Sequence, residues 1–313
     1  MENLALVVRY FHLHLATAFV AMLAATAISC RLTGVIINDS WSIVIAVFAT
    51  LVAIMPLLIF WQDKKRFDMR EAALAIPWGL AFAGMLPLCV VAAARSHQPL
   101  QDSRFAHIDS FFGVNIPQVA GWAAHHALGN TISKTYNLLI PLMLLALLAP
   151  ALAGQWKEAR AYVTSNVAAF AIGVPLFYLF PAVGPWYAYN ILPNTQQLQC
   201  QASLLLLRSA PSPFVASASG VICFPSFHVI WAVLCWRALW GFRPLRVPVS
   251  ILCTMIILST MTTGWHYFTD VLGGLIVAAI CIAIAEWHRK SLGASYESNE
   301  PRPAGSAHHL GSF

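Results

Sequence analysis

The sequence predicts an all-α fold, a polytopic bundle of about eight transmembrane helices with a six-helix core. Composition is the first reason: 59% of the 313 residues are hydrophobic and only 10% are charged. Soluble domains carry roughly 25% charged residues. Because these few charged residues cannot cover a water-exposed surface, most of the surface of this protein is expected to face lipid. The second and third reasons are apolar runs of membrane-spanning length and an asymmetric distribution of basic residues.

The apolar runs approach the roughly 17–25 residues that a helix needs to cross a bilayer. Prolines inside several of them are compatible with membrane helices, where neighbouring groups satisfy the freed carbonyls. The clearest predicted spans are 41–61, 72–94, 163–183 and 267–287, and less regular ones are 11–30, 135–153, 226–242 and 247–263.

Basic residues predict the orientation. With the N-terminus inside, 13 of the 18 Lys and Arg residues fall in or beside cytoplasmic loops and 5 fall outside. Excess positive charge marks cytoplasmic loops, so both termini are expected to be cytoplasmic. The same rule accounts for the net charge of +6 without a nucleic-acid partner. A signal peptide at the N-terminus is the alternative, but its removal would leave the remaining spans starting outside.

Four regions follow from this topology. Residues 1–94 are expected to form N-terminal transmembrane helices, and 95–134 a long outer loop. Residues 135–287 are expected to form the catalytic transmembrane core, which includes a second long outer loop from about Gly184 to Cys223. The remaining 288–313 are rich in Ser, Gly, Pro and His and predict a disordered cytoplasmic tail. Long loops on one side favour a working surface there.

The first chemical motif is Phe224-Pro225-Ser226-Phe227-His228, at the expected outer start of the sixth helix. Proline suits the first turn of a helix. The unpaired N–H groups of such a turn attract an anion. Ser226 adds a hydroxyl donor and His228 an imidazole, so this motif predicts a phosphate-binding site.

The second motif is the stretch Gly264–Asp270. Gly264 is expected to end the seventh helix and His266 to open the eighth. Asp270 follows His266 by four residues, a spacing that places both on one helical face. The acid would fix the imidazole tautomer and stabilise its cation. Helices six and eight both run inward, so their starts, and with them His228 and His266, are expected to meet at the outer face.

The two motifs carry a family resemblance. FPSFH resembles the Pro-Ser-x-His motif of the type 2 phosphatidic acid phosphatase superfamily, and HYFTD resembles its closing His-x-x-x-Asp. Within that superfamily, GWHYFTDVLGG is most similar to the inositol phosphorylceramide synthase branch. The segment Phe180–Trp186 resembles the Pro-rich element of the same branch. The resemblance covers roughly residues 130–285.

The resemblance implies a lipid phosphatase or phosphotransferase, integral in the membrane, with catalytic residues His228, His266 and Asp270. His266 would attack phosphorus and form a phosphohistidine, oriented by Asp270, while His228 would protonate the leaving oxygen and later activate the acceptor. The substrate would be a membrane lipid, and the acceptor water or a lipid or polyol hydroxyl. The family implies no metal and no other cofactor, and the site would face outward, most simply from the plasma membrane.

The sequence departs from the family in its cationic residues. The Lys and Arg-Pro of the first family motif are absent, and Ser259-Thr260 stands where an arginine usually precedes the second His. Trp186 stands where related sequences place Arg. Phosphoryl transfer needs positive charge at the phosphate oxygens, and Lys134 is the preferred substitute, with Ser226 as the second phosphate-binding residue. Other outer candidates are Arg31, Arg95, Arg104 and Arg208.

Two alternatives to an active enzyme remain open, and so does one disulfide bond. The bundle could serve a non-enzymatic lipid transporter or scramblase, although no internal repeat of the kind common in transporters is visible. The chain could also be a catalytically impaired relative. Cys200 and Cys223 both fall in the second outer loop, where a disulfide would be chemically possible.

Overall fold

The computed structural model describes residues 2–34, 36–37, 67–209, 214–215 and 222–297. The predicted span 41–61 lies outside them. The described chain is helical except for two-residue strands β1 (Ile36–Ile37) and β2 (Phe214–Val215), which pair in parallel. The helices are α1 (Glu2–Thr33), α3 (Phe67–Ala94), α4 (Asp102–Phe111), α5 (Ile116–His125), α6 (Ala127–Lys134), η2 (Thr135–Leu138), α7 (Leu139–Leu152), α8 (Trp156–Leu179), α9 (Pro185–Ala188), α10 (Thr195–Ser209), α11 (Phe227–Leu239), η3 (Arg243–Leu245), α12 (Arg246–Thr262) and α13 (Phe268–Glu297).

The predicted helical membrane bundle is confirmed. In the described part of the chain, six helical segments are long and apolar enough to cross a membrane: Leu13–Leu32, Ile76–Ala94, Ala127–Leu152, Trp156–Leu179, Arg243–Thr262 and Phe268–Lys290. A seventh, α11, is apolar but has only 13 residues. Each predicted span other than 41–61 therefore coincides with a helix.

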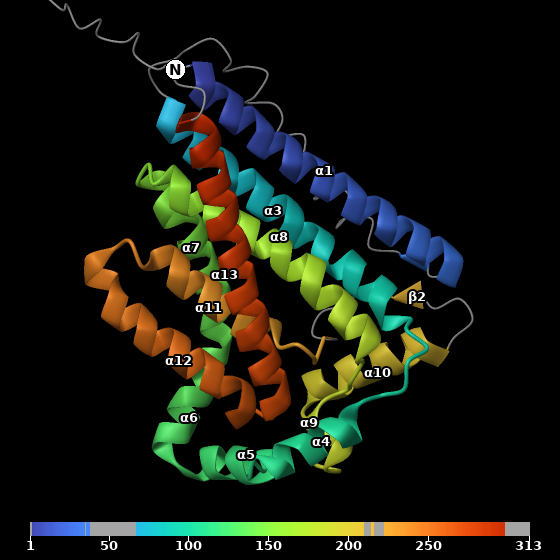
Figure 1. Ribbon diagram of the computed structural model, residues 1–313. Helices are drawn as coiled ribbons and strands as arrows, with labels where there is room; N and C mark the ends of the chain where they lie inside the picture. The colour runs from blue at the N-terminus through green and yellow to red at the C-terminus, as the bar shows by residue number, and fades with distance from the viewer. Residues whose placement is uncertain (1, 35, 38–66, 210–213, 216–221, 298–313) are drawn as a thin grey trace, which may run out of the picture.

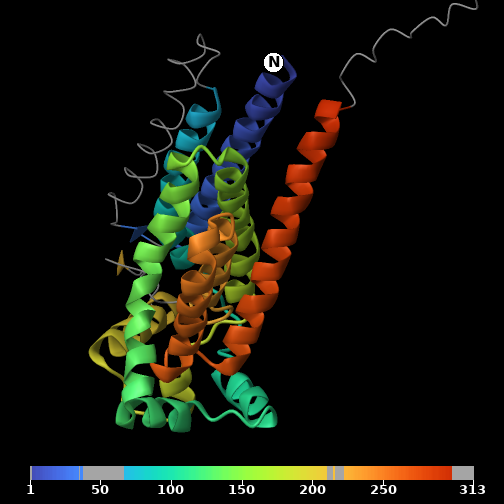
Figure 2. The same cartoon turned by 90° about the vertical axis from the view of Figure 1, so that its left-hand side faces the viewer.

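The long helices lie side by side, with α8 packed against α3, α7, α11 and α13 (Figure 1). A continuous apolar core joins them, including the fully buried Trp78, Met85 and Ile230. Short helices α4, α5 and α9 gather at one end of the bundle, called here the site end (Figures 1 and 2). The N-terminal end of α1 and the C-terminal end of α13 both lie at the opposite end.

Where the structure describes the two regions expected as long loops, both contain helices, which are α4, α5 and α6 in 95–134 and α9 and α10 in 184–223. Residues 95–134 contain α4, α5 and α6, and α6 continues through η2 into α7 as one apolar segment. Asn115 caps α5 by accepting a hydrogen bond from the Gln118 amide at 3.1 Å, and Pro117 lies in the first turn, both typical of helix starts. At the other end, α13 continues to Glu297, so the tail expected from residue 288 begins as helix; residues 298–313 lie outside the description.

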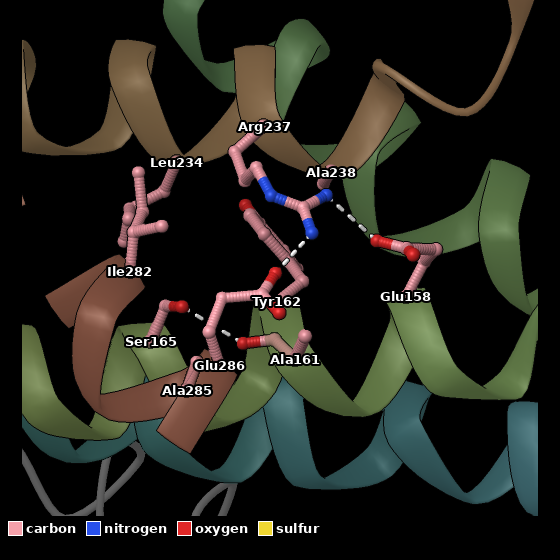
Figure 3. Close-up of a pocket in the computed structure, with 10 residues that line it drawn as sticks. All are labelled: Glu158, Ala161, Tyr162, Ser165, Leu234, Arg237, Ala238, Ile282, Ala285 and Glu286. Atoms are coloured by element: carbon pink, nitrogen blue, oxygen red, sulfur yellow. Dashed lines mark hydrogen bonds and ion pairs between the residues drawn. The ribbon is translucent and has the colours of Figure 1, made fainter. Parts of the chain in front are cut away.

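Arg237 lies in the last turn of α11, at the end of this helix away from His228. Its guanidinium pairs with Glu158 of α8 at 2.8 Å and with Glu286 of α13 (Figure 3). The adjoining cavity of about 10 Å³ holds no more than about one water molecule. This cluster therefore ties three helices together by charge and offers no room for a substrate.

Candidate active site

The FPSFH motif forms the start of α11. Ser226 is the N-cap, and its hydroxyl oxygen accepts a hydrogen bond from the Val229 amide at 3.4 Å. Pro225 therefore lies before the cap, and the expectation that it occupies the first helical turn was wrong, because the serine hydroxyl can satisfy a first-turn amide. No described residue accepts a hydrogen bond from the amides of Phe227 and His228. These two N–H groups are available to an anion.

The turn before α13 carries His266. Helix α12 ends at Thr262, and Gly264 follows with φ of +70°, a left-handed conformation that favours glycine. The Gly264 amide bonds to the Met261 carbonyl at 3.0 Å and the Trp265 amide to the Thr260 carbonyl at 3.1 Å, which is the Schellman pattern of a helix end. The prediction that Gly264 ends this helix is confirmed.

His266 and Asp270 meet, but not on one helical face as expected. Helix α13 begins at Phe268, so His266 lies two residues before it. Asp270, at the third helical position, folds back and accepts a hydrogen bond from the Tyr267 amide at 2.8 Å, the acidic half of a capping box. This return brings its Oδ2 to 3.3 Å from Nδ1 of His266.

The two motifs lie against each other. The Ser226 amide donates to the Asp270 carbonyl at 3.2 Å, which joins the start of α11 to the start of α13 directly. The ring centroids of His228 and His266 are 6.0 Å apart, with an angle of 53° between the ring planes. Both rings can therefore reach one phosphorus atom. His266 is nearly buried, with 4% of its surface exposed, whereas His228 is half-buried.

Asp270 is fully buried and lies at the centre of the hydrogen bonding. Its Oδ2 accepts from the Tyr267 amide, from Cys223 Sγ at 3.0 Å and from His266. Its Oδ1 has no partner among the described residues. Since His266 uses Nδ1 for this contact, its Nε2 is left for chemistry.

Cys223 is a site residue that the sequence reasoning considered only for a disulfide. All seven cysteines are thiols in the structure, so the bond considered between Cys200 and Cys223 is not formed. Burial raises the pKa of the Cys223 thiol well above its ordinary value, and the neighbouring carboxylate of Asp270 raises it further. The group therefore stays protonated and donates to the aspartate.

Cys223, His266 and Asp270 also form a group with the spacing of metal ligands. Their donor atoms lie within 4.8 Å of one another, and all three residues are buried. Thiol, imidazole and carboxylate are ligands that zinc accepts. In this structure the three groups hydrogen bond to one another through the single atom Oδ2 of Asp270.

Aromatic rings line one side of the histidine pair. Tyr136 of η2 stacks on His228 with a centroid distance of 4.1 Å, and on Trp265 at 6.1 Å. The Tyr136 hydroxyl lies 3.4 Å from Nδ1 of His228. Because the two rings are nearly parallel, stacking rather than an in-plane hydrogen bond is their main contact. Trp186 packs edge-on against Trp265 at 5.4 Å and extends this wall.

A cleft of about 380 Å³ opens beside these rings. Its size is in the range of small-molecule sites. None of the residues that line it carries a formal charge. The lining combines amides, hydroxyls, small side chains and two of the stacked rings: Ala120, Ala123, Ala124, Asn130, Ser133, Tyr136, Asn137, Asn194, Gln196, Thr262, Thr263 and Trp265.

The predicted cation Lys134 is exposed at the end of α6 and does not line this cleft. Three of the other cationic candidates donate hydrogen bonds to backbone carbonyls or to a neighbouring side chain. Arg95 donates to the Leu207 carbonyl, Arg208 to the Ser96 and Gln98 carbonyls, and Arg104 to the Gln101 side chain. None of these hydrogen bonds involves His228 or His266, so neutral donors dominate the described surroundings of the site.

Residues 103–284 match a family model described as the PAP2 superfamily. The matched segment makes up more than half of the 313 residues. The superfamily expected from the two histidine motifs is thereby confirmed. No curated protein and no solved structure matches the chain.

Proposed function

The chain belongs to the PAP2 superfamily, and from this premise we propose that it is a lipid phosphatase or phosphotransferase that works through a phosphohistidine. PAP2 membership and the apolar helices fit a membrane protein of phosphatase type. One observation carries the finer proposal. His266 contacts the buried carboxylate of Asp270 through Nδ1, while its ring lies 6.0 Å from that of His228.

In the first step, the Nε2 lone pair of His266 attacks phosphorus. The N–P bond forms as the bond to the leaving oxygen breaks, and His228 gives that oxygen a proton. The phosphorylated imidazole carries positive charge, which the carboxylate of Asp270 stabilises. Cys223 and the Tyr267 amide hold that carboxylate in place.

In the second step, His228 takes the proton of an acceptor hydroxyl. The acceptor oxygen bonds to phosphorus and the N–P bond breaks, which regenerates His266. Water as acceptor gives a phosphatase, whereas a lipid or polyol hydroxyl gives a transferase. The uncharged cleft beside Tyr136 suits a hydroxyl-bearing group, and this supports a transferase similar to the inositol phosphorylceramide synthase branch.

The phosphate would lie at the start of α11. The amides of Phe227 and His228 have no described acceptor there, and the N-terminus of a helix favours an anion. Ser226 shapes this turn as its cap, and its hydroxyl hydrogen adds a donor. Lys134 remains our proposed cation, reaching in from the end of α6 when substrate is bound. No step of this scheme requires a metal.

A lipid substrate also accords with the length of α11. Thirteen residues span about 20 Å, whereas the hydrocarbon core of a bilayer is about 30 Å thick. Because the helix is about 10 Å shorter than that core, we place its start, with His228, below the membrane surface, where a lipid substrate can reach it from the side. We further propose that the site faces the outside of the plasma membrane, because basic residues favour cytoplasmic termini.

The test uses the full chain in lipid nanodiscs with a panel of lipid phosphates and hydroxyl acceptors. Phosphate release and headgroup transfer are measured for the wild type and for His266→Ala. His97→Ala is the matched control, because His97 is exposed and remote in sequence from both motifs. We expect loss of turnover only in His266→Ala. Unchanged turnover in that variant would overturn the mechanism.

One observation favours a second candidate, a catalytically impaired relative. None of the described residues that line the cleft beside the histidine pair is an arginine, and cations usually stabilise the transferred phosphoryl group. A wild type that turns over no member of the panel would favour this impaired relative and refute the enzyme. Movement of labelled lipids between leaflets by the same protein would identify a scramblase.

A further inference from the structure

Helix α4 presents one face to the turn that carries His266. Asp102, Phe105 and Asp109 follow one another at spacings of three and four, so they share a face of the helix. All three are buried, with exposed fractions of 3%, 6% and 0%. Phe105 packs on Phe224 at a centroid distance of 5.0 Å and on Tyr267 at 5.8 Å. This face therefore contacts one residue of each histidine motif.

Asp109 caps α13 from outside that helix. The residue in the N-cap position of α13 is Tyr267, whose side chain cannot accept the first-turn amides. Asp109 Oδ2 accepts from the Phe268 amide at 2.8 Å, and Oδ1 accepts from the Thr269 amide at 2.8 Å and its hydroxyl at 2.7 Å. Both oxygens are needed to serve three donors, so a carboxylate fits this position better than a hydroxyl or an amide.

Asp102, two turns earlier, holds the neighbouring segment. Its carboxylate accepts from the amides of Val183 at 3.0 Å and Gly184 at 2.9 Å. The Tyr267 hydroxyl lies 3.0 Å from Asp102 Oδ1 and 2.9 Å from the Gly184 carbonyl. Burial raises the pKa of Asp102, and these hydrogen bonds oppose that shift. Asp102 thus links α4, the Pro-rich segment and the residue that follows His266.

We infer that α4 is a positioning helix. Its Asp109, supported by Asp102, holds the turn that carries His266 in the position needed for phosphoryl transfer. This inference rests on the proposed function. Five successive amides in the turn have acceptors: Trp265 and His266 bond to the Thr260 carbonyl, Tyr267 to Asp270, and Phe268 and Thr269 to Asp109. Asp109 supplies the last two. Without it, the first turn of α13 loses its cap, and that turn contains Asp270.

The expected effect falls on turnover. A displacement of about 1 Å at a reacting group can lower the rate about 100-fold. We expect Asp109→Asn, which keeps one of the two oxygens, to lower kcat about 10-fold with KM within about twofold of wild type. Asp109→Ala should lower kcat further. Ser103→Ala, on the exposed face of the same helix, should leave both constants unchanged.

A second pair of variants tests the contact from the other side. Thr269→Val removes the hydroxyl that donates to Asp109 while keeping the amide, and Thr269→Ser keeps both. We expect Thr269→Val to lower kcat about threefold and Thr269→Ser to restore it. Thr269 and Asp109 share one contact. In the double variant Asp109→Asn with Thr269→Val, the fold-decrease in kcat should therefore be smaller than the product of the two single fold-decreases.

Hydrogen–deuterium exchange of the peptide around 264–272 gives a readout independent of activity. Asp109→Asn should make its amides exchange faster than in the wild type, while peptides of α8 stay unchanged. Normal kcat in folded Asp109→Asn, or unchanged exchange in this peptide, would overturn the inference. If the wild type itself has no turnover, the proposed function fails, and the exchange data still decide whether α4 holds the turn.

Discussion

Replacing Asp270 by asparagine removes one buried charge while keeping the shape of the side chain. Asp270 is fully buried, and its Oδ2 lies 3.3 Å from Nδ1 of His266. That distance is longer than the roughly 2.7–2.9 Å of a strong charge-assisted bond. The contact is therefore weak while His266 is neutral and strengthens when phosphorylation makes the ring cationic. The substitution should affect the transition state more than substrate binding.

The magnitude follows from the geometry. Two unit charges 3.3 Å apart interact by about 5 kcal/mol at an effective dielectric constant of about 20. The asparagine oxygen retains a neutral hydrogen bond worth about 0.5–1.5 kcal/mol. The net loss of transition-state stabilisation is then about 3.5–4.5 kcal/mol, which corresponds to a kcat about 400- to 2,000-fold lower. KM should change little, because a fully buried carboxylate does not contact the substrate.

The assay is rapid-quench measurement of phosphoenzyme formation with a radiolabelled lipid phosphate in nanodiscs. Glu286→Gln is the matched control, since it makes the same carboxylate-to-amide change in α13, about 24 Å along the helix from Asp270. Its carboxylate pairs with Arg237 and Arg289 at the other end of the bundle. Thermal unfolding in detergent checks that both variants are folded. A folded Asp270→Asn that forms phosphoenzyme within fivefold of the wild-type rate refutes the role assigned to Asp270.

Three further predictions concern Cys223 and Tyr136, which contact Asp270 and His228. Cys223→Ser should keep kcat within about threefold of the wild-type value. Cys223→Ala should lower kcat about fivefold, because it removes a hydrogen-bond donor to Asp270 worth about 1 kcal/mol. Equal activity of the two variants would exclude a role for this donor. Since the pKa of the Cys223 thiol is raised, native protein at pH 8 should resist iodoacetamide at this position, as peptide mass spectrometry can check. Tyr136→Phe keeps the ring on His228 and should retain turnover within about twofold, whereas Tyr136→Ala removes a stacking contact worth about 1 kcal/mol and should lower it about fivefold. Steady-state turnover distinguishes these cases, and an alanine variant as active as the phenylalanine variant would contradict the role of the ring.

Much of the fold could be predicted because its signals are local. Apolar runs of membrane-spanning length coincide with helices everywhere that the structure describes a predicted span. The meeting of His228 and His266 was also predictable, since alternating spans return every second helix start to the same end. Gly264 marked the end of its helix through a conformation that glycine adopts most easily.

The details of the site were less predictable. The sequence placed His266 inside a helix, but the first-turn amides of α13 bond to Asp109, about 160 residues away along the chain. The carboxylates of α4 did leave a signal, because acidic residues are rare in this chain and Asp102 and Asp109 share a helical face. Nothing in the local sequence, however, identified what that face would contact.

The sequence by itself determined the class of the protein, its membrane helices and the two histidine motifs that indicated the PAP2 superfamily, because hydropathy and short-range spacing act within one or two helical turns. Only the tertiary structure decided which partners complete the motifs: Cys223 on Asp270, Tyr136 on His228, and the aspartates of α4 beneath the turn at His266. Those contacts form between segments far apart in the chain. Their geometry depends on how the helices pack, and no local pattern of residues contains that information.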